Sequence, residues 1–176
     1  MSRHYEDSTV EVIEALHNGL RVETGIVNAT GGLLFTANQT LPIFTVYGTI
    51  RINILFGEVT TVFGAGASVA MFMFQSTTPA LAAGAMSIDC AAVNGLVAGG
   101  RVTFQGDLVG TAPTITGAAG VSYWPATNGK MVLGRPSGIG QIQLVTSAAA
   151  TIASGAMAFT LCYTPISEGA YAEPIF

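Results

Sequence analysis

The apolar residues of this chain occur in short runs that are separated by turn residues about every 8–12 positions. Val, Ile, Thr and aromatic residues fill the runs, while Gly, Pro, Asn and Ser separate them. This spacing predicts an all-β fold, a jelly-roll-like β-sandwich. The predicted strands are Gly25–Thr30, Ile43–Leu55, Glu58–Phe63, Val69–Gln75, Met86–Val93, Arg101–Gln105, Thr114–Ser122, Met131–Leu133, Gln141–Thr146 and Ala156–Tyr163.

Alternation along two of these runs predicts which side chains share a face. Successive side chains of a strand point to opposite faces, so Ile50, Ile52 and Ile54 are expected on one face and Leu55 on the other. The run Val69–Gln75 has apolar side chains at both odd and even positions, so both faces of this strand would be apolar. Such a strand lies inside a sandwich or is covered on its outer face by a partner.

One helix is predicted, near the N-terminus. The segment Ser8–Asn18 opens with a capping box, and Asn18-Gly19 supplies a left-handed stop. Val12 or Ile13 and Leu16 fall about one turn apart and form a narrow apolar stripe. A helix of roughly three turns is not stable alone. We therefore expect it to dock on its own β domain, on a neighbouring subunit or on an underlying lattice.

Charge is scarce and unevenly distributed. Only 9% of the 176 residues are charged, against about a quarter in an ordinary soluble domain. Seven charged residues lie in residues 1–23 and nine in residues 24–176. This contrast divides the chain into an N-terminal arm, residues 1–24, and a β domain with a C-terminal tail, residues 25–176. A folded monomer of this size would expose roughly 8,000 Å², and so few charges cannot cover that surface. We therefore expect an obligate homo-oligomer, with a trimer as the first choice.

Several classes of partner are excluded by composition. The net charge of −4 and the isoelectric point of about 4.9 argue against nucleic-acid binding, which needs clustered Lys and Arg. The chain holds no run of about 18 uninterrupted apolar residues, so no membrane-spanning helix is expected. The N-terminal sequence has no apolar signal core, and synthesis in the cytoplasm is expected.

Candidate chemistry is sparse, and no enzyme is predicted. His4 and His17 are the two histidines and have no companion cysteines, so no metal site is expected. A serine or cysteine nucleophile would have to take its base from the N-terminal segment. Glycine pairs lack the setting of a phosphate loop, so no cofactor is expected. A Glu58/Asp89 pair of glycosidase type is not excluded, but unplaced acids do not identify one.

The cysteines and the single tryptophan favour structural roles. Cys90 and Cys162 lie far apart in apolar runs, which favours two free, buried thiols over a disulfide between them. Trp124, in a Tyr-Trp-Pro sequence, is expected to plug one end of the β domain or to anchor an interface. A sugar-binding platform built on Tyr123 and Trp124 is the alternative.

The C-terminal segment forms a second arm-like element. It leaves a strand at Pro165 and continues as a tail that carries Tyr171, Ile175 and Phe176. A tail with these side chains is not expected to extend freely into water. We expect it to pack on the β domain or to insert into a neighbouring subunit.

Three phrases of the sequence carry a resemblance to a known group: FTVYGTIRINILFGEVTTVFG (residues 44–64), FQSTTPA (74–80) and FTLCYTPISEGAYAEPIF (159–176). Together with the charged N-terminal helix, they resemble small virion structural proteins of tailed bacteriophages, which include capsid decoration, or cement, subunits. The resemblance implies a non-enzymatic, oligomeric role on a particle surface, with trimers common and the major capsid protein as a partner. A tail, neck or head-fibre component and a carbohydrate-binding adhesin are the alternatives.

Overall fold

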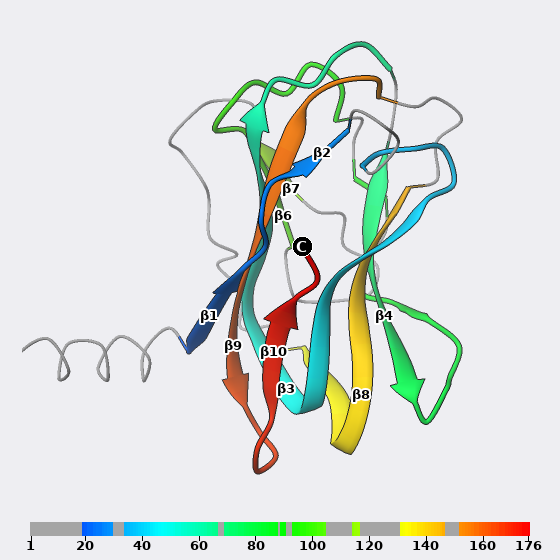
Figure 1. Cartoon of the computed structure of the whole chain (residues 1–176), viewed down its shortest axis with the longest axis vertical. Helices are drawn as coiled ribbons and strands as arrows, with labels where there is room; N and C mark the ends of the chain where they lie inside the picture. Colours follow the sequence, from blue (N-terminus) through cyan, green and yellow to red (C-terminus); the bar gives the residue numbers. More distant parts are fainter. Residues whose placement is uncertain are drawn as a thin grey trace, which may run out of the picture.

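The computed structural model describes residues 19–29, 34–66, 69–87, 89–90, 93–104, 114–116, 131–146 and 152–176. The regular secondary structure of these residues consists of β-strands (Figure 1), which confirms the predicted all-β class. The predicted helix Ser8–Asn18 lies outside the described residues. In the part of the chain that the structure describes, no helix is long and apolar enough to cross a membrane.

The strands join in one antiparallel sheet with the order β1-β9-β3-β8-β4-β5. In addition, β10 and β6 pair with β3, β2 pairs with β9, and β7 pairs with β6. Their bounds are β1 Leu20–Glu23, β2 Val27–Asn28, β3 Thr40–Thr61, β4 Ala70–Thr78, β5 Gly84–Ala85, β6 Arg101–Thr103, β7 Thr114–Thr116, β8 Val132–Thr146, β9 Ala156–Pro165 and β10 Tyr171–Pro174.

The long strand β3 organises the sheet. Its first half, Thr40–Arg51, pairs with β8, and its second half, Ile50–Thr61, pairs with β9. Figure 1 shows β3 running down the molecule, bending at its lower end and returning upward, so the two halves lie across the interior from each other. A strand that bends in this way takes part in two layers of one continuous sheet.

The bend lies at Gly48, which has a φ of +70°. A Cβ atom there would lie 2.7 Å from Ser167 Oγ and 2.9 Å from the Ala170 Cβ. On the opposite flank, Gly134 approaches the carbonyl of Gly48 so closely that a side chain would collide with it. The connection between β9 and β10 on one side and β8 on the other thus crowd this point, and only glycine combines the left-handed conformation with the available space.

The two predicted strands Ile43–Leu55 and Glu58–Phe63 are one strand, and the predicted break between them is wrong. Gly57 pairs with Val102 on one side and with Phe159 on the other. A Cβ on Gly57 would lie 2.9 Å from the Phe159 ring. The glycine therefore marks a close approach of a neighbouring ring inside a continuous strand rather than a turn.

The predicted facing of the three isoleucines is wrong at Ile54. Ile50 and Ile52 are buried, but Ile54 is half-buried while Leu55 is fully buried. In the pairing with β9, Ile52 and Ile54 oppose consecutive residues, so one extra residue of β3 is inserted at Asn53. This bulge shifts the inward phase from even to odd positions.

The predicted strands Met131–Leu133 and Gln141–Thr146 are likewise parts of one strand, β8. Gly134 opposes Thr49 and Ile139 opposes Tyr47, so five residue steps along β8 match only two along β3. The residues between Gly134 and Ile139 therefore leave the regular ladder with β3, and the strand rejoins it at Ile139. The predicted separation into two strands is therefore wrong.

Other boundaries differ more. The predicted strand Met86–Val93 is wrong in its described residues, where Met86, Ser87 and Cys90 bond irregularly to the edge of β4 through their backbone N–H groups. Of the described part of Gly25–Thr30, residues 25–29, only Val27–Asn28 is a strand. The strands β1, β5 and β10 were not predicted. Each is short and is defined by its partner strand rather than by its own pattern.

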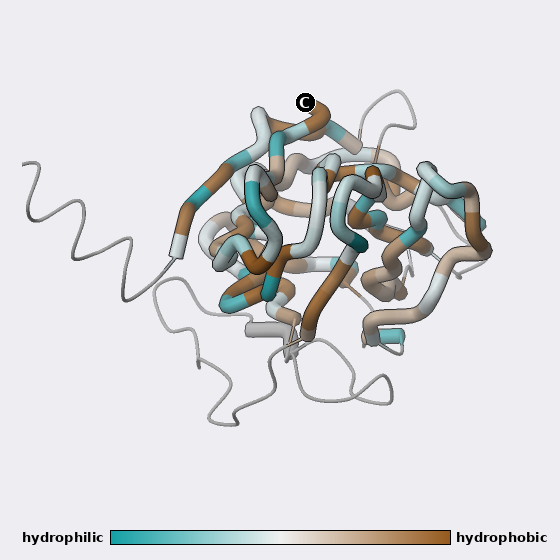
Figure 2. The backbone as a smooth tube through the Cα atoms, turned by 90° about the horizontal axis from the view of Figure 1, so that it is seen from below, coloured by the Kyte–Doolittle hydropathy of each residue, from teal (hydrophilic) through white to brown (hydrophobic). Residues whose placement is uncertain are grey.

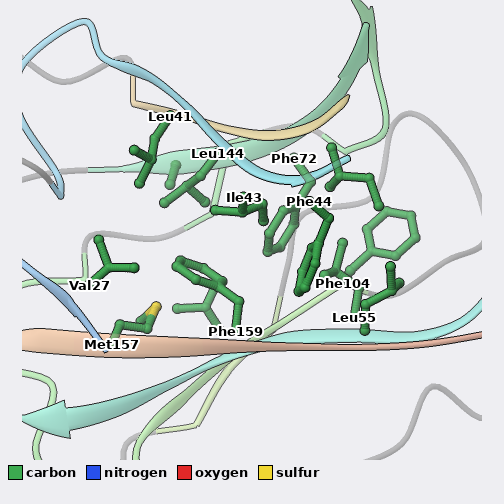
Figure 3. Packing of buried hydrophobic residues seen from close by; sticks show 14 of the residues in the cluster. Val27, Leu41, Ile43, Phe44, Leu55, Phe72, Phe104, Leu144, Met157 and Phe159 are labelled. Atoms are coloured by element: carbon green, nitrogen blue, oxygen red, sulfur yellow. The ribbon is translucent and has the colours of Figure 1, made fainter. Parts of the chain in front are cut away.

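The inward faces of the sheet enclose a core of large apolar side chains (Figure 3). Phe35, Phe44, Phe72 and Phe159 are fully buried. The rings of Phe72 and Phe104 meet edge to face, with centroids 6.1 Å apart, an arrangement that suits the ring quadrupoles. Along the backbone, short apolar and polar stretches alternate (Figure 2), as expected when one side of each strand faces the core.

Candidate assembly surface

The C-terminal strand β10 lies in line with β9 along the same edge of β3. Tyr171–Pro174 pairs with Phe44–Tyr47, and the N–H of Ile175 extends the pairing to the carbonyl of Ile43 at 3.1 Å. Ala172 points inward, and its N–H donates a 3.0 Å hydrogen bond to the hydroxyl of Tyr163. The tail therefore packs on its own β domain in this structure, one of the two predicted outcomes.

The end of the tail reaches across to the segment between β1 and β2. The carbonyl of Phe176 accepts a 2.9 Å hydrogen bond from the N–H of Gly25. The tail remains apolar and open on its outer side, with Tyr171, Ile175 and Phe176 exposed by 44%, 40% and 42%. Ile26, next to Gly25, is exposed by 62%. Segments from both ends of the described chain that carry exposed apolar side chains are thus joined by a backbone hydrogen bond.

A tyrosine pair and a carboxylate order the outer face of β10. The rings of Tyr47 and Tyr171 stack with centroids 4.4 Å apart and planes 13° from parallel. The hydroxyl of Tyr47 donates a 2.7 Å hydrogen bond to the carboxylate of Glu173. Because the phenol bonds to this carboxylate, and because desolvation adds to the effect, the pKa of Tyr47 rises to about 12.

We call this surface the tail face and define it by its exposed or half-buried residues: Ile26, Tyr47, Tyr171, Glu173, Ile175 and Phe176. Glu173 is the one charged side chain in this set, and its carboxylate is already engaged by Tyr47, while the exposed Arg21–Glu23 ion pair lies on β1, which contacts β10. A surface of aromatic and aliphatic side chains with a single partnered charge has the composition of an interface core. The chemistry it supports is packing against another protein surface.

Sequence reasoning found three members of this face and missed others. Tyr171, Ile175 and Phe176 are exposed in the structure, and their role in binding a partner stays a prediction. Tyr47 and Ile26 were missed, because only the long-range pairing with β10 and the bond to Gly25 place them beside the tail.

The remaining predicted binding residues, Val12, Ile13, Leu16 and Trp124, lie outside the described residues.

A groove of about 420 Å³ opens between the β4–β5 edge and the start of β8. Its walls include Phe74, Leu81, Met131 and Val132, and one charged residue, Arg135, lies at its border. Apart from Arg135 and the hydroxyl of a serine, the side chains that line it are apolar or absent, so it offers few groups for acid–base or nucleophilic chemistry.

Of the two acids considered for catalysis, Glu58 pairs with an arginine on the neighbouring strand. Arg101 Nε donates a 2.7 Å hydrogen bond to Glu58 Oε2, and the two side chains form an ion pair across β3 and β6. The Arg101 guanidinium also lies 5.1 Å from the centre of the Phe56 ring. Glu58 is therefore part of a cross-strand cluster. Among the described residues, no group of three or more His, Cys, Asp or Glu side chains is placed to hold a metal ion.

Both cysteines are buried and free, which confirms the favoured prediction for them. The Sγ atom of Cys90 accepts a 3.3 Å hydrogen bond from the N–H of Ala70. Desolvation raises the pKa of Cys90 and that of Cys162 above the ordinary value for a thiol. Thiols of this kind remain protonated and unreactive near neutral pH.

The class that fold and surface define is an all-β protein of one antiparallel sheet with an apolar face at its C-terminal strand. Comparison of the chain with protein-family models, with curated proteins and with solved structures gives no match.

Proposed function

We propose that this protein is a non-enzymatic structural subunit of a virus particle, a capsid decoration (cement) protein that stabilises a phage head through contacts between subunits. The tail face carries the proposal: five of its six residues are large and apolar or aromatic, and its one carboxylate already bonds to Tyr47. Burial of apolar area drives association at roughly 25 cal/mol per Å² before entropic costs. A chain with so few charges gains solubility by burying such a surface.

In this proposal the protein acts by packing. Homotrimers bury their tail faces, and the sheet closes as a jelly-roll-like sandwich beneath them. The N-terminal arm, with Val12, Ile13 and Leu16, docks on the major capsid protein at the junctions between its subunits. Three linked arms bind with an avidity far above that of one arm. The resemblance of the three sequence phrases to phage virion proteins supports a place on a phage particle. The apolar composition of the tail face supports association between subunits.

Sedimentation velocity of full-length variants tests the oligomer. Replacement of Ile175 and Phe176 by serine is expected to weaken self-association by roughly tenfold or more, since each 1.4 kcal/mol of lost burial is tenfold in the equilibrium constant. The matched control replaces Val62 and Val97, exposed by 51% and 45% away from the tail face, by serine. The control should associate like the unmodified chain. A monomeric unmodified protein at micromolar concentration would contradict the proposal.

Co-sedimentation with undecorated phage heads tests the particle. The unmodified chain should bind in stoichiometric amounts, and the double variant V12S/L16S should bind more weakly while keeping its oligomeric state. Failure of the unmodified chain to bind heads, with binding to tails or to glycans instead, would move the protein to one of the alternative classes.

A further inference from the structure

The connection between β9 and β10 is longer than its path requires. Pro165, the last residue of β9, opposes Ile50, and Tyr171, the first residue of β10, opposes Tyr47. The gap is three residue steps along β3 but six along the connecting chain. At about 3.3 Å per extended residue, these correspond to roughly 10 Å and 20 Å. The surplus is taken up by residues 166–170, which loop out from the sheet.

The segment beyond this connector contributes little to the core of its own chain. Between residues 166 and 176, only Ala170 and Ala172 are buried. Each brings a single methyl group. The large side chains of the segment, Ile166, Tyr171, Ile175 and Phe176, are all exposed by 40% or more. Segments with few buried apolar contacts open at low free energy relative to the rest of a domain.

The connector also has the features of a hinge. Gly169 has a φ of +69°, and a side chain added there would meet open space. The N–H groups of Ile166 and Ser167 both donate to the carbonyl of Thr49, at 2.8 and 3.2 Å. The buried hydroxyl of Thr49, at the same place, has no hydrogen-bond partner in the described structure. Ile166 is exposed by 54% at the outer end of the loop.

We propose that β10 is exchanged between copies of this chain, so that the tail of one subunit pairs with the Phe44–Tyr47 edge of β3 in its neighbour. The inference rests on the proposed function, because exchange requires the oligomer. The exchanged strand re-forms the contacts it makes within one chain: the ladder with β3, the Tyr47–Glu173 bond, and the bond from Ala172 to Tyr163. The contacts that change are those of the connector itself: its bonds to Thr49, its packing against Gly48, and the bond from the Ala170 N–H to the Ser167 carbonyl.

Exchange fixes how neighbours are placed. The connector extends to about 20 Å, so the receiving edge of the neighbour must begin within that distance of Pro165. The residues 166–170 of adjacent subunits then lie at their junction, and Ile166 is covered there. Exchange of an identical element is a low-cost route to an oligomer because no new contact has to be invented.

Disulfide trapping in the assembled protein tests the exchange. Thr45 and Glu173 oppose each other in the β3–β10 register, and opposed residues of an antiparallel pair lie about 4.5–5.5 Å apart at Cα, within the range a disulfide spans. The double variant T45C/E173C is oxidised and separated by non-reducing electrophoresis. We expect most of the chain in covalent dimer and trimer bands. The matched control, E23C/T160C, opposes two residues of β1 and β9 and should run as a monomer.

A second measurement uses single variants. Chains carrying T45C alone and tagged chains carrying E173C alone are mixed, unfolded, refolded together and oxidised. Exchange predicts a disulfide-linked pair of one tagged and one untagged chain. Sedimentation of the same samples separates the two proposals. An oligomer whose T45C/E173C chains remain monomeric on the gel, and which yields no mixed pair, overturns the exchange and leaves the proposed function intact. A monomer in sedimentation overturns both.

Discussion

The hydroxyl of Tyr47 donates a 2.7 Å hydrogen bond to the carboxylate of Glu173, a residue 126 positions further along the chain. The bond crosses the seam between β3 and β10, and the stacked rings of Tyr47 and Tyr171 lie beside it. These three side chains tie the C-terminal strand to the sheet on its outer side. The inner side contributes Ala172 and its bond to Tyr163.

The Tyr47 phenol should titrate late. Its pKa of about 12 in the folded state lies above the ordinary value of 10.0, because the phenol bonds to the carboxylate of Glu173. The stabilisation that follows is fully present below pH 10 and is lost as the pH rises from about 10 to about 12. Phenolate absorbance should show one group near pH 12 that is missing in Y47F, and E173Q should move that group toward pH 10. A Tyr47 that ionises near pH 10 in the unmodified chain would contradict this.

Alanine at Gly48 should be far more costly than alanine at Gly169. Both glycines have φ near +70°, so both substitutions meet the left-handed penalty of about 1–2 kcal/mol. Only at Gly48 does the new methyl group also crowd Ser167 and Ala170. We expect G48A to lose about 2–4 kcal/mol of unfolding free energy and G169A about 1 kcal/mol. Urea denaturation measures both, and equal losses would show that crowding at the bend does not matter.

Replacement of Thr49 by valine should stabilise the protein. Its buried hydroxyl has no partner in the described structure, and an unpaired buried hydroxyl costs about 1–3 kcal/mol. The valine variant keeps the shape and removes that cost, so a gain of about 1 kcal/mol is expected. The control is T146V, which removes a hydroxyl that accepts from the N–H of Gln39 at 3.0 Å and donates to the carbonyl of Thr36. T146V should be destabilising, and a loss in T49V would refute the argument.

The two thiols should be shielded in the folded protein. Burial raises the pKa of both Cys90 and Cys162, so Ellman's reagent at pH 8 should react slowly until the chain unfolds, when two thiols should react without added reductant. Because the folded-state pKa values lie above 9.0, the unfolded chain releases these protons first, and the thiols' contribution to stability falls as the pH rises above about 9. A chain with no reactive thiol after unfolding would instead contain a disulfide.

Much of the fold could be predicted because the signal is local. Short runs of β-branched and aromatic residues separated by glycine predicted the all-β class, and the apolar settings of Cys90 and Cys162 predicted buried free thiols. The apolar side chains of the C-terminal tail marked Tyr171, Ile175 and Phe176, each of which is at least 40% exposed in the structure. In each case the residue type and its immediate neighbours carry the information.

What the sequence could not supply depends on strands that are distant along the chain. A break was predicted between Leu55 and Glu58, yet Gly57 lies inside a continuous strand that pairs on both sides, with the ring of Phe159 close to it. The bulge at Asn53, which turns Leu55 inward in place of Ile54, exists only in the register with β9. Side-chain period along a strand is local, but register is set by the partner strand, and one inserted residue reverses every face beyond it. Composition therefore determined that the chain forms a β sheet with an apolar tail, while tertiary pairing alone decided where the sheet bends and which residues meet at the tail face.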